Sequence, residues 1–257
     1  NSKYHRIGVI IKKFIITLSL VFVLFSSNGC SQKDVHAVFQ SNGASIVREH
    51  TTVLQRLLLR YYDKLNKRNP RYTTKIESIP IIYDIKNRTN NATLPLLNEK
   101  KDATYKDYLN IAFSRDNVKN RNDYLIAGIY KMFYWAYSID RPHTVTTLQY
   151  EAEKIQEANK MMQVIQYRVE NEKDLRGNYL FLTWQRQWQV DVLKSIYTHE
   201  TIDLNNYKKE ELIKPSNMNF KITTEGMIFT LQESLKYLGA ESTNLGTAAI
   251  SSVFMFL

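Results

Sequence analysis

The segment Tyr124–Ile139 (YLIAGIYKMFYWAYSI) restricts the fold of this chain most strongly, because it is apolar on almost every side. Lys131 is its only charged residue. A helix without a polar face has to be surrounded by other elements. As a helix it would rise only about 24 Å, less than the roughly 30 Å hydrocarbon core of a bilayer. The segment therefore predicts a helix in the middle of a bundle or at an interface.

Helical spacing of apolar residues recurs along most of the chain. It runs from Ser45 to Leu65 and resumes after Thr104. The longest near-heptad stripe, Val145–Val169, follows Pro142, and Tyr179–Tyr197 is the predicted antiparallel neighbour of that stripe. The 257 residues include only 8 Gly and 5 Pro, which disfavours many-turned β architectures. These patterns predict an all-α, multi-helix bundle with long antiparallel helices.

Several boundaries are expected from local signals. Asp123 is a plausible N-cap for the central apolar helix, and Thr223 or Thr224 for a final helix that Gly239 would close. The isoleucine-rich stretch 76–85 contains Pro80, so we expect one short strand or an extended segment there. The apolar tail 248–257 is expected to dock onto the domain, since a free apolar tail promotes aggregation.

The N-terminal region has the three parts of an export signal. Four basic residues and no acidic one precede the apolar run Phe14–Phe25, and small or polar residues follow up to the only cysteine of the chain, Cys30. Ser27-Asn28-Gly29-Cys30 resembles the lipobox of bacterial lipoprotein precursors. The alternative is an ordinary secreted protein that is cleaved nearby and keeps a free thiol.

The lipoprotein resemblance implies that residues 1–29 are removed and that Cys30 carries acyl chains such as palmitate. Two or three acyl chains hold a protein stably on a membrane. Residues 30–44 would then be a lipidated tether and residues 45–257 a single helical domain. Ser31 after the cysteine is similar to outer-membrane cargo of this class, which faces the periplasm of the bacterial cell envelope.

The positive net charge restricts the classes of molecule that such a domain could bind. Removing residues 1–29 lowers the formal net charge from +10 to +6. Outside the cytoplasm the available polyanions are lipid head groups, lipopolysaccharide phosphates and acidic cell-wall polymers rather than nucleic acid. Simple solubility is the alternative explanation of the charge.

Two groups of residues are candidates for a ligand or partner surface. Arg68, Arg71 and Lys75 belong to the densest positive run of the mature chain. Trp184 and Trp188 are one helical turn apart and could stack on a sugar ring, although paired aromatic residues more commonly belong to a core.

Catalytic and cofactor motifs are not found in the sequence. His199-Glu200 begins like a zinc-protease motif, but no second histidine follows at the required spacing, and there is no phosphate-binding loop or nucleophile elbow. The sequence therefore predicts no cofactor and favours a non-catalytic, lipid-anchored helical protein that assists assembly through an envelope protein partner. The alternative is a protein that binds cell-wall glycan or polyanion, and a weaker one is an unrecognised peptidoglycan-active enzyme.

Overall fold

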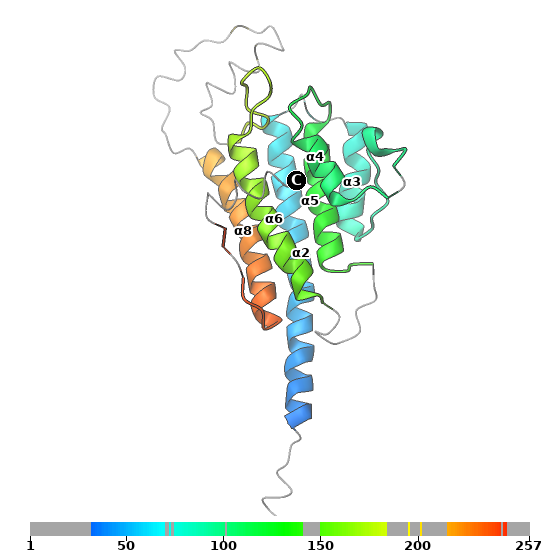
Figure 1. Ribbon diagram of the computed structural model, residues 1–257, viewed down its shortest axis with the longest axis vertical. Coiled ribbons are helices and arrows are strands. Elements are labelled where there is room, and N and C mark those ends of the chain that lie inside the picture. The colour runs from blue at the N-terminus through cyan, green and yellow to red at the C-terminus, as the bar shows by residue number, and fades with distance from the viewer. Residues whose placement is uncertain are drawn as a thin grey trace, which may run out of the picture.

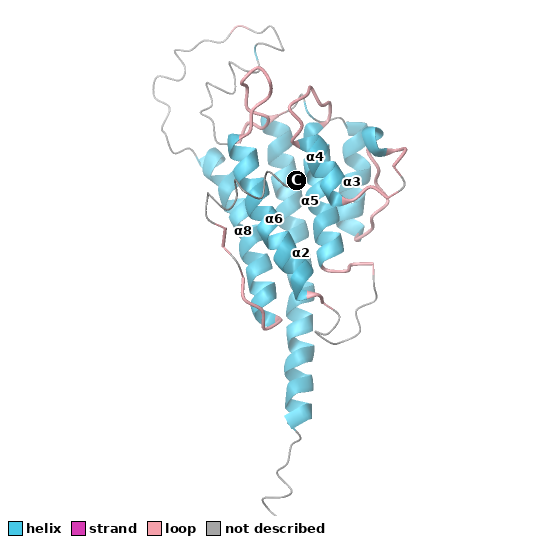
Figure 2. Ribbon diagram, in the orientation of Figure 1, coloured by secondary structure: helices cyan, strands magenta, loops and turns pink. Residues whose placement is uncertain are grey.

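The computed structural model describes residues 32–69, 72, 75–100, 102–140, 150–183, 195, 201, 215–242 and 244–245, with the backbone alone at 32–44, 75 and 215–219. These residues form six α-helices and one short 3-10 helix (Figure 2), namely α2 (Gln32–Arg68), α3 (Lys75–Asn87), η2 (Pro95–Leu97), α4 (Tyr105–Ala112), α5 (Arg121–Ala136), α6 (Ala152–Asn171) and α8 (Pro215–Tyr237). One isolated bridge, Lys173 to Tyr179, is the only β pairing within the described ranges. The predicted all-α bundle is confirmed.

The helices pack around the C-terminal part of α2 (Figure 1). The main neighbours of α2 are α8 and α5, while α6 lies against α8 and α5. Helix α4 packs on α5, and α3 lies at the edge of the bundle against α5 and α2. The N-terminal part of α2 projects beyond the other helices. The bundle therefore surrounds α2 and α5 and leaves one side of α3 outside.

Helix α2 begins earlier than the apolar spacing indicates. It starts at Gln32 and is continuous for 37 residues, so residues 32–44 of the stretch interpreted as a tether are helical. Adding a residue to an existing helix is far easier than nucleating one, and the packed part of α2 supplies the nucleus. Its buried stripe includes Val47, Leu54 and Leu65, which lie in the range where helical spacing was predicted.

Helix α5 confirms the prediction of a central helix. Nearly all its residues are buried, including Leu125, Ile126 and Ile129. At Gly128 an added Cβ would lie 2.8 Å from Leu109 Cδ2, so this glycine allows α4 to approach closely. The helix starts at Arg121 after the left-handed Asn120 (φ 57°), so the expected N-cap, Asp123, was wrong. Asp123 is instead buried and accepts a hydrogen bond from Tyr62.

The expectation of a strand near residues 76–85 was wrong, because this stretch belongs to helix α3 with Pro80 inside it. Proline removes one helical hydrogen bond and crowds the preceding turn. Tertiary contacts outweigh this local cost. Ile81 and Ile85 are buried against the bundle, and the Asp84 carboxylate accepts hydrogen bonds from Thr89 Oγ1 and Ala92 N, both at 2.6 Å.

The predicted helical neighbour at 179–197 was also wrong at its start. Residues 179–183 are not helical, and the remainder, apart from Ser195, lies outside the described residues. The Asn69 side chain pairs with the backbone of Leu182 as a strand would, since Nδ2 donates to the carbonyl (3.2 Å) and Oδ1 accepts from the amide (2.8 Å). Helix α6 packs against α8 and α5 instead.

Two other helix starts differ from expectation. Tyr150 and Glu151 are not helical and α6 begins at Ala152, while residues 141–149 lie outside the described residues. Helix α8 begins at Pro215, which places Thr224 inside the helix, where Oγ1 donates to the Phe220 carbonyl (3.2 Å). Gly239 follows α8 in the left-handed conformation (φ 73°), as predicted.

Candidate interaction surfaces

An apolar side of α3 faces solvent. Its members, called here the α3 face, are Ile76, Ile79, Pro80 and Tyr83, which recur at helical spacing. Ile76 is 85% exposed, Ile79 65% and Tyr83 60%. Single exposed apolar residues are ordinary, but a contiguous set on one element marks an interaction site. The α3 face is therefore the first candidate surface.

The bundle fixes the orientation of α3. Tyr130 OH on α5 lies within hydrogen-bonding distance of the carbonyl oxygens of Asp84 (2.9 Å) and Thr89 (2.7 Å), which share its one proton. Arg88 follows the helix and donates from Nη2 to Thr52 Oγ1 on α2 (2.6 Å). Rolling α3 to bury its exposed apolar side would break these bonds and expose Ile81 and Ile85. The exposure of the α3 face is therefore a property of the packed fold.

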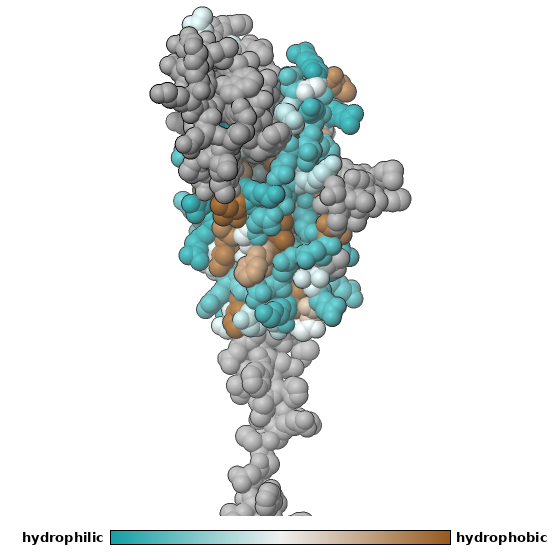
Figure 3. Space-filling view, turned by 90° about the vertical axis from the view of Figure 1, so that its left-hand side faces the viewer, coloured by the Kyte–Doolittle hydropathy of each residue, from teal (hydrophilic) through white to brown (hydrophobic). Residues whose placement is uncertain are grey.

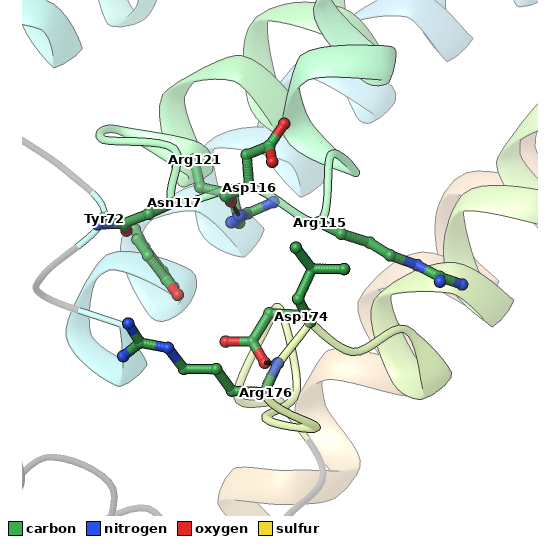
Figure 4. A pocket seen from close by; sticks show the side chains of 8 residues that line it. Tyr72, Arg115, Asp116, Asn117, Arg121, Asp174 and Arg176 are labelled. Carbon is green, nitrogen blue, oxygen red and sulfur yellow. Dashed lines mark hydrogen bonds between the residues drawn. The ribbon is translucent and has the colours of Figure 1, made fainter.

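A polar pocket is the second candidate surface (Figure 4). It has a volume of about 250 Å³ and lies where residue 72, the turn before α5 and the loop after α6 meet. Eight residues line it, namely Tyr72, Arg115, Asp116, Asn117, Arg121, Asp174, Leu175 and Arg176.

Arg121 stabilises the turn that lines this pocket. It is buried, and Nη1 donates to the carbonyls of Ala112 and Ser114, both at 2.7 Å, while Nη2 donates to that of Asp116 at 2.6 Å. Its guanidinium also lies 5.5 Å from the Tyr72 ring centroid. Because these contacts use its donors to hold the turn, Arg121 supports the pocket rather than offering a charge to a ligand.

The remaining cations of the pocket are Arg115 and Arg176, and both are exposed. Arg176 extends toward the side on which Tyr72 lies, whereas Arg115 points away (Figure 4). Asp174 is occupied by its own loop, since Oδ1 accepts from the amides of Arg176 (2.9 Å) and Asn178 (2.8 Å). An anionic group would therefore meet Arg176 first.

The site residues expected from sequence are only partly described. Arg68 lies in the last turn of α2 and is 8% exposed, so it offers little surface. Lys75 begins α3. Tyr72, inside the same basic stretch, lines the polar pocket. Cys30, Arg71, Trp184 and Trp188 lie outside the described residues.

A serine and a histidine that are 184 positions apart meet inside the bundle, which no sequence spacing could indicate. His50 Nδ1 lies 2.8 Å from Ser234 Oγ, and Tyr137 OH lies 2.7 Å from the same oxygen. Ser234 Oγ also lies 2.9 Å from the Thr230 carbonyl, to which it donates. Burial lowers the pKa of His50, although nearby Glu233 and Glu49 oppose this shift.

This serine-histidine pair is structural rather than catalytic. Ser234 is completely buried. The Thr230 carbonyl oxygen lies as close to the Ser234 hydroxyl as His50 Nδ1 does, so the two compete for its proton. The pair links α2 to α8, and Tyr137 after α5 completes the connection.

The part of the chain that the structure describes has neither a metal-ligand cluster nor a membrane-spanning helix. No group of three or more His, Cys, Asp or Glu residues there could hold a metal ion. None of the helices there is both long and apolar enough to cross a bilayer. No known protein family, curated protein or solved structure matches this chain.

Proposed function

We propose that this chain is a lipid-anchored protein of the bacterial cell envelope that binds a partner protein through the α3 face. The anchor is the acylated Cys30 in the outer membrane, and the domain faces the periplasm. The observation that carries the binding role is the set of three large apolar side chains exposed on a helix whose orientation is fixed.

The position of α3 along the chain supports this arrangement. Cys30 precedes the first residue of α2, Gln32, by two positions, and a helix of 37 residues is about 55 Å long. Helix α3 begins at Lys75, shortly after α2 ends. An anchor at Cys30 would therefore leave the start of α3 at the far end of α2 from the lipid. The α3 face is suited to a partner protein rather than to the anchoring membrane.

The lipid anchor is tested by the mass of the mature N-terminus. The full chain, expressed with its leader in a Gram-negative host, is expected to begin at an acylated Cys30 and to incorporate labelled palmitate. The Cys30→Ser variant is the control and should incorporate none. Recovery of unlipidated protein that retains residues 14–25 would contradict the proposal.

The partner-binding role is tested with a charged substitution on the α3 face. Ile79→Asp should abolish co-purification of the envelope partner, because a carboxylate would be buried in an apolar interface. Lys160→Asp on the exposed surface of α6 is the matched control and should leave it intact. Equal co-purification with both variants would exclude the α3 face as the binding surface.

The polar pocket favours a second candidate function, binding of an anionic cell-wall polymer or lipopolysaccharide phosphate. Arg176 supplies an exposed positive charge on the side of the pocket where Tyr72 lies. The Arg176→Gln variant should then bind purified lipopolysaccharide several-fold more weakly, with a reduced salt dependence. Lys160→Gln removes one charge elsewhere and is the control. Equal binding by the two variants would remove this candidate.

A further inference from the structure

The segment that follows α8 forms one end of a groove between α6 and α8. Gly239 takes the left-handed conformation (φ 73°), and the chain then turns back beside α8 (Figure 1). Gln232 Nε2 on α8 donates to Asn244 Oδ1, and the Leu245 amide donates to Gln163 Oε1 on α6, both at 2.7 Å. These bonds hold residues 244 and 245 at the end of the groove.

The groove has a volume of about 700 Å³. Tyr167 of α6 and Ile228 and Phe229 of α8 supply its apolar surface, and Phe229 is the most exposed of the three, at 62%. Apolar residues form a broken vertical line on the face of the molecule that carries α8 (Figure 3). Ligand sites commonly have volumes of about 300–1,000 Å³ and combine an apolar lining with a few fixed polar groups. The groove therefore has the dimensions of a ligand site.

Amide side chains supply polar groups at fixed positions in the groove. The bond between Gln232 and Asn244 uses one atom of each amide, and it leaves Gln232 Oε1 as an acceptor and Asn244 Nδ2 as a donor to which no other described residue bonds. Gln166 of α6 is also held, because its Nε2 donates to Glu225 Oε1 of α8 (3.1 Å). An acceptor beside a donor suits a hydroxyl group, which can both donate and accept. Because these amides are already ordered, binding would cost little further side-chain entropy.

The charged groups of the groove favour an uncharged ligand. Glu170 of α6 and Glu225 of α8 both line it, and Lys221 is the one cation among the lining residues. Burial raises the pKa of the Glu170 carboxyl, Lys221 opposes this rise and Glu225 adds to it. An anionic ligand would be repelled by the two carboxylates. A ligand with hydroxyl groups could instead use the carboxylates and the donors of Lys221 and Asn244 together.

The length of the groove favours a chain of sugars over a single sugar. From Gln163 to Glu170, α6 rises about 10 Å, and from Lys221 to Gln232, α8 rises about 16 Å. Both lengths exceed a single pyranose ring. A pyranose has an apolar C–H face and a rim of hydroxyl groups, so it matches an exposed aromatic ring that has amides and carboxylates around it.

We propose that the groove between α6 and α8 binds an uncharged oligosaccharide, which stacks one sugar face on Phe229 and directs hydroxyl groups to Gln232 and Asn244. Helices α6 and α8 carry neither the α3 face nor the polar pocket. The inference therefore depends on neither of those surfaces, nor on the lipid anchor.

Calorimetric titration of the full chain with tetrasaccharides tests this inference. Cellotetraose and tetra-N-acetylchitotetraose are uncharged probes, and tetragalacturonate is their anionic counterpart. We expect saturable binding of an uncharged probe with little dependence on salt, and tetragalacturonate at the same concentration should not displace it. Absence of binding by both uncharged probes, or displacement by tetragalacturonate, would overturn the proposal.

Substitutions on α8 locate the site. Phe229→Ala should weaken binding of the uncharged probe about tenfold, or about 1.4 kcal/mol, whereas Phe229→Tyr keeps a ring and should stay within about twofold. Ile222→Ala is the matched control, because Ile222 is similarly exposed (59% against 62%) but does not line the groove. Equal losses with Phe229→Ala and Ile222→Ala, or no loss with either, would overturn the assignment.

Carbene footprinting of the native chain locates the ligand without any substitution. A saturating uncharged probe should lower the modification of Phe229 and Tyr167 and leave that of Arg176, in the polar pocket, unchanged. Protection of Arg176 instead of Phe229 would place the sugar in the polar pocket and contradict the proposal. Unchanged modification of all three side chains would contradict it as well.

Discussion

Helices α5 and α3 have similarly apolar sequences but very different surroundings. Helix α5 is covered on nearly every side, whereas α3 buries Ile81 and Ile85 and exposes Ile76, Ile79 and Tyr83. Tyr130 of α5 joins the two helices through its contacts with the Asp84 and Thr89 carbonyls. The difference shows that apolar content alone does not determine burial. The uncovered apolar side of α3 is what the fold leaves available for a partner.

The largest expected effect comes from a charge on the buried side of α3. Ile81→Asp would place an unpaired carboxylate among apolar side chains and should largely unfold the protein. Ile79→Asp, on the exposed side, should change stability by less than about 1 kcal/mol. Urea denaturation followed by circular dichroism measures both. Similar losses for the two variants would show that the α3 face is packed in the isolated chain.

A milder version compares the same truncation in the two helices. Ile129→Ala in α5 should cost about 2–5 kcal/mol, because it removes buried methyl groups and leaves a cavity. Ile79→Ala in α3 should stay within about 0.5 kcal/mol. The free energies of unfolding in urea of Ile129→Ala and Ile79→Ala measure this difference. A loss of more than about 2 kcal/mol of unfolding free energy in Ile79→Ala would contradict the expected difference between the two helices.

The tight packing of α5 is tested at Gly128. In Gly128→Ala the new Cβ would lie 2.8 Å from Leu109 Cδ2 and 3.2 Å from the Leu109 amide nitrogen. Overpacking of this kind costs about 1–3 kcal/mol, partly offset by up to about 1 kcal/mol of helix propensity. Gly226→Ala in α8, whose Cβ would meet only the flexible end of Leu57 at 3.3 Å, is the control and should be neutral or stabilising. The thermal midpoints of the two variants should therefore differ in direction.

The smallest expected effect is a pH dependence at the buried polar contact of α2 with α8. Burial lowers the folded-state pKa of His50, so below about pH 6.5 the unfolded chain binds more protons at this position than the folded chain. Stability should fall as the pH drops from 7.5 to 5.5, and His50→Gln should lose part of that fall. Parallel pH profiles of the two proteins in urea denaturation would contradict this assignment.

Sequence patterns predicted the elements whose burial follows from local spacing. The stripe of α2 through Leu54 and Leu65, the enclosure of α5 and the closing role of Gly239 were all predicted correctly. The sequence patterns failed where long-range contacts outweigh the local conformational preference. Pro80 argued against a helix, but the bonds of Asp84 and Tyr130 hold α3 in place. The bonds of Asn69 to Leu182 likewise keep residues 179–183 out of a helix.

The candidate surfaces were less predictable for the same reason. The exposure of Ile79 depends on which side of α3 the bundle covers, and that side is set by residues on α5 and α2. The polar pocket joins Tyr72 to Arg115 and Arg176, which lie on loops far apart in the sequence. Tyr72 of the pocket lies within the basic stretch, but the predicted residue Arg68 is largely buried.

The most direct test of the partner-binding account is photo-crosslinking in intact cells from a benzoylphenylalanine at position 83. The account predicts a discrete crosslinked species from position 83 and none from position 160, an exposed position on α6. That species should disappear when Ile79→Asp is present. Equal crosslinking from both positions, or none from 83 in a correctly folded and lipidated protein, would contradict the claim that a partner covers the α3 face.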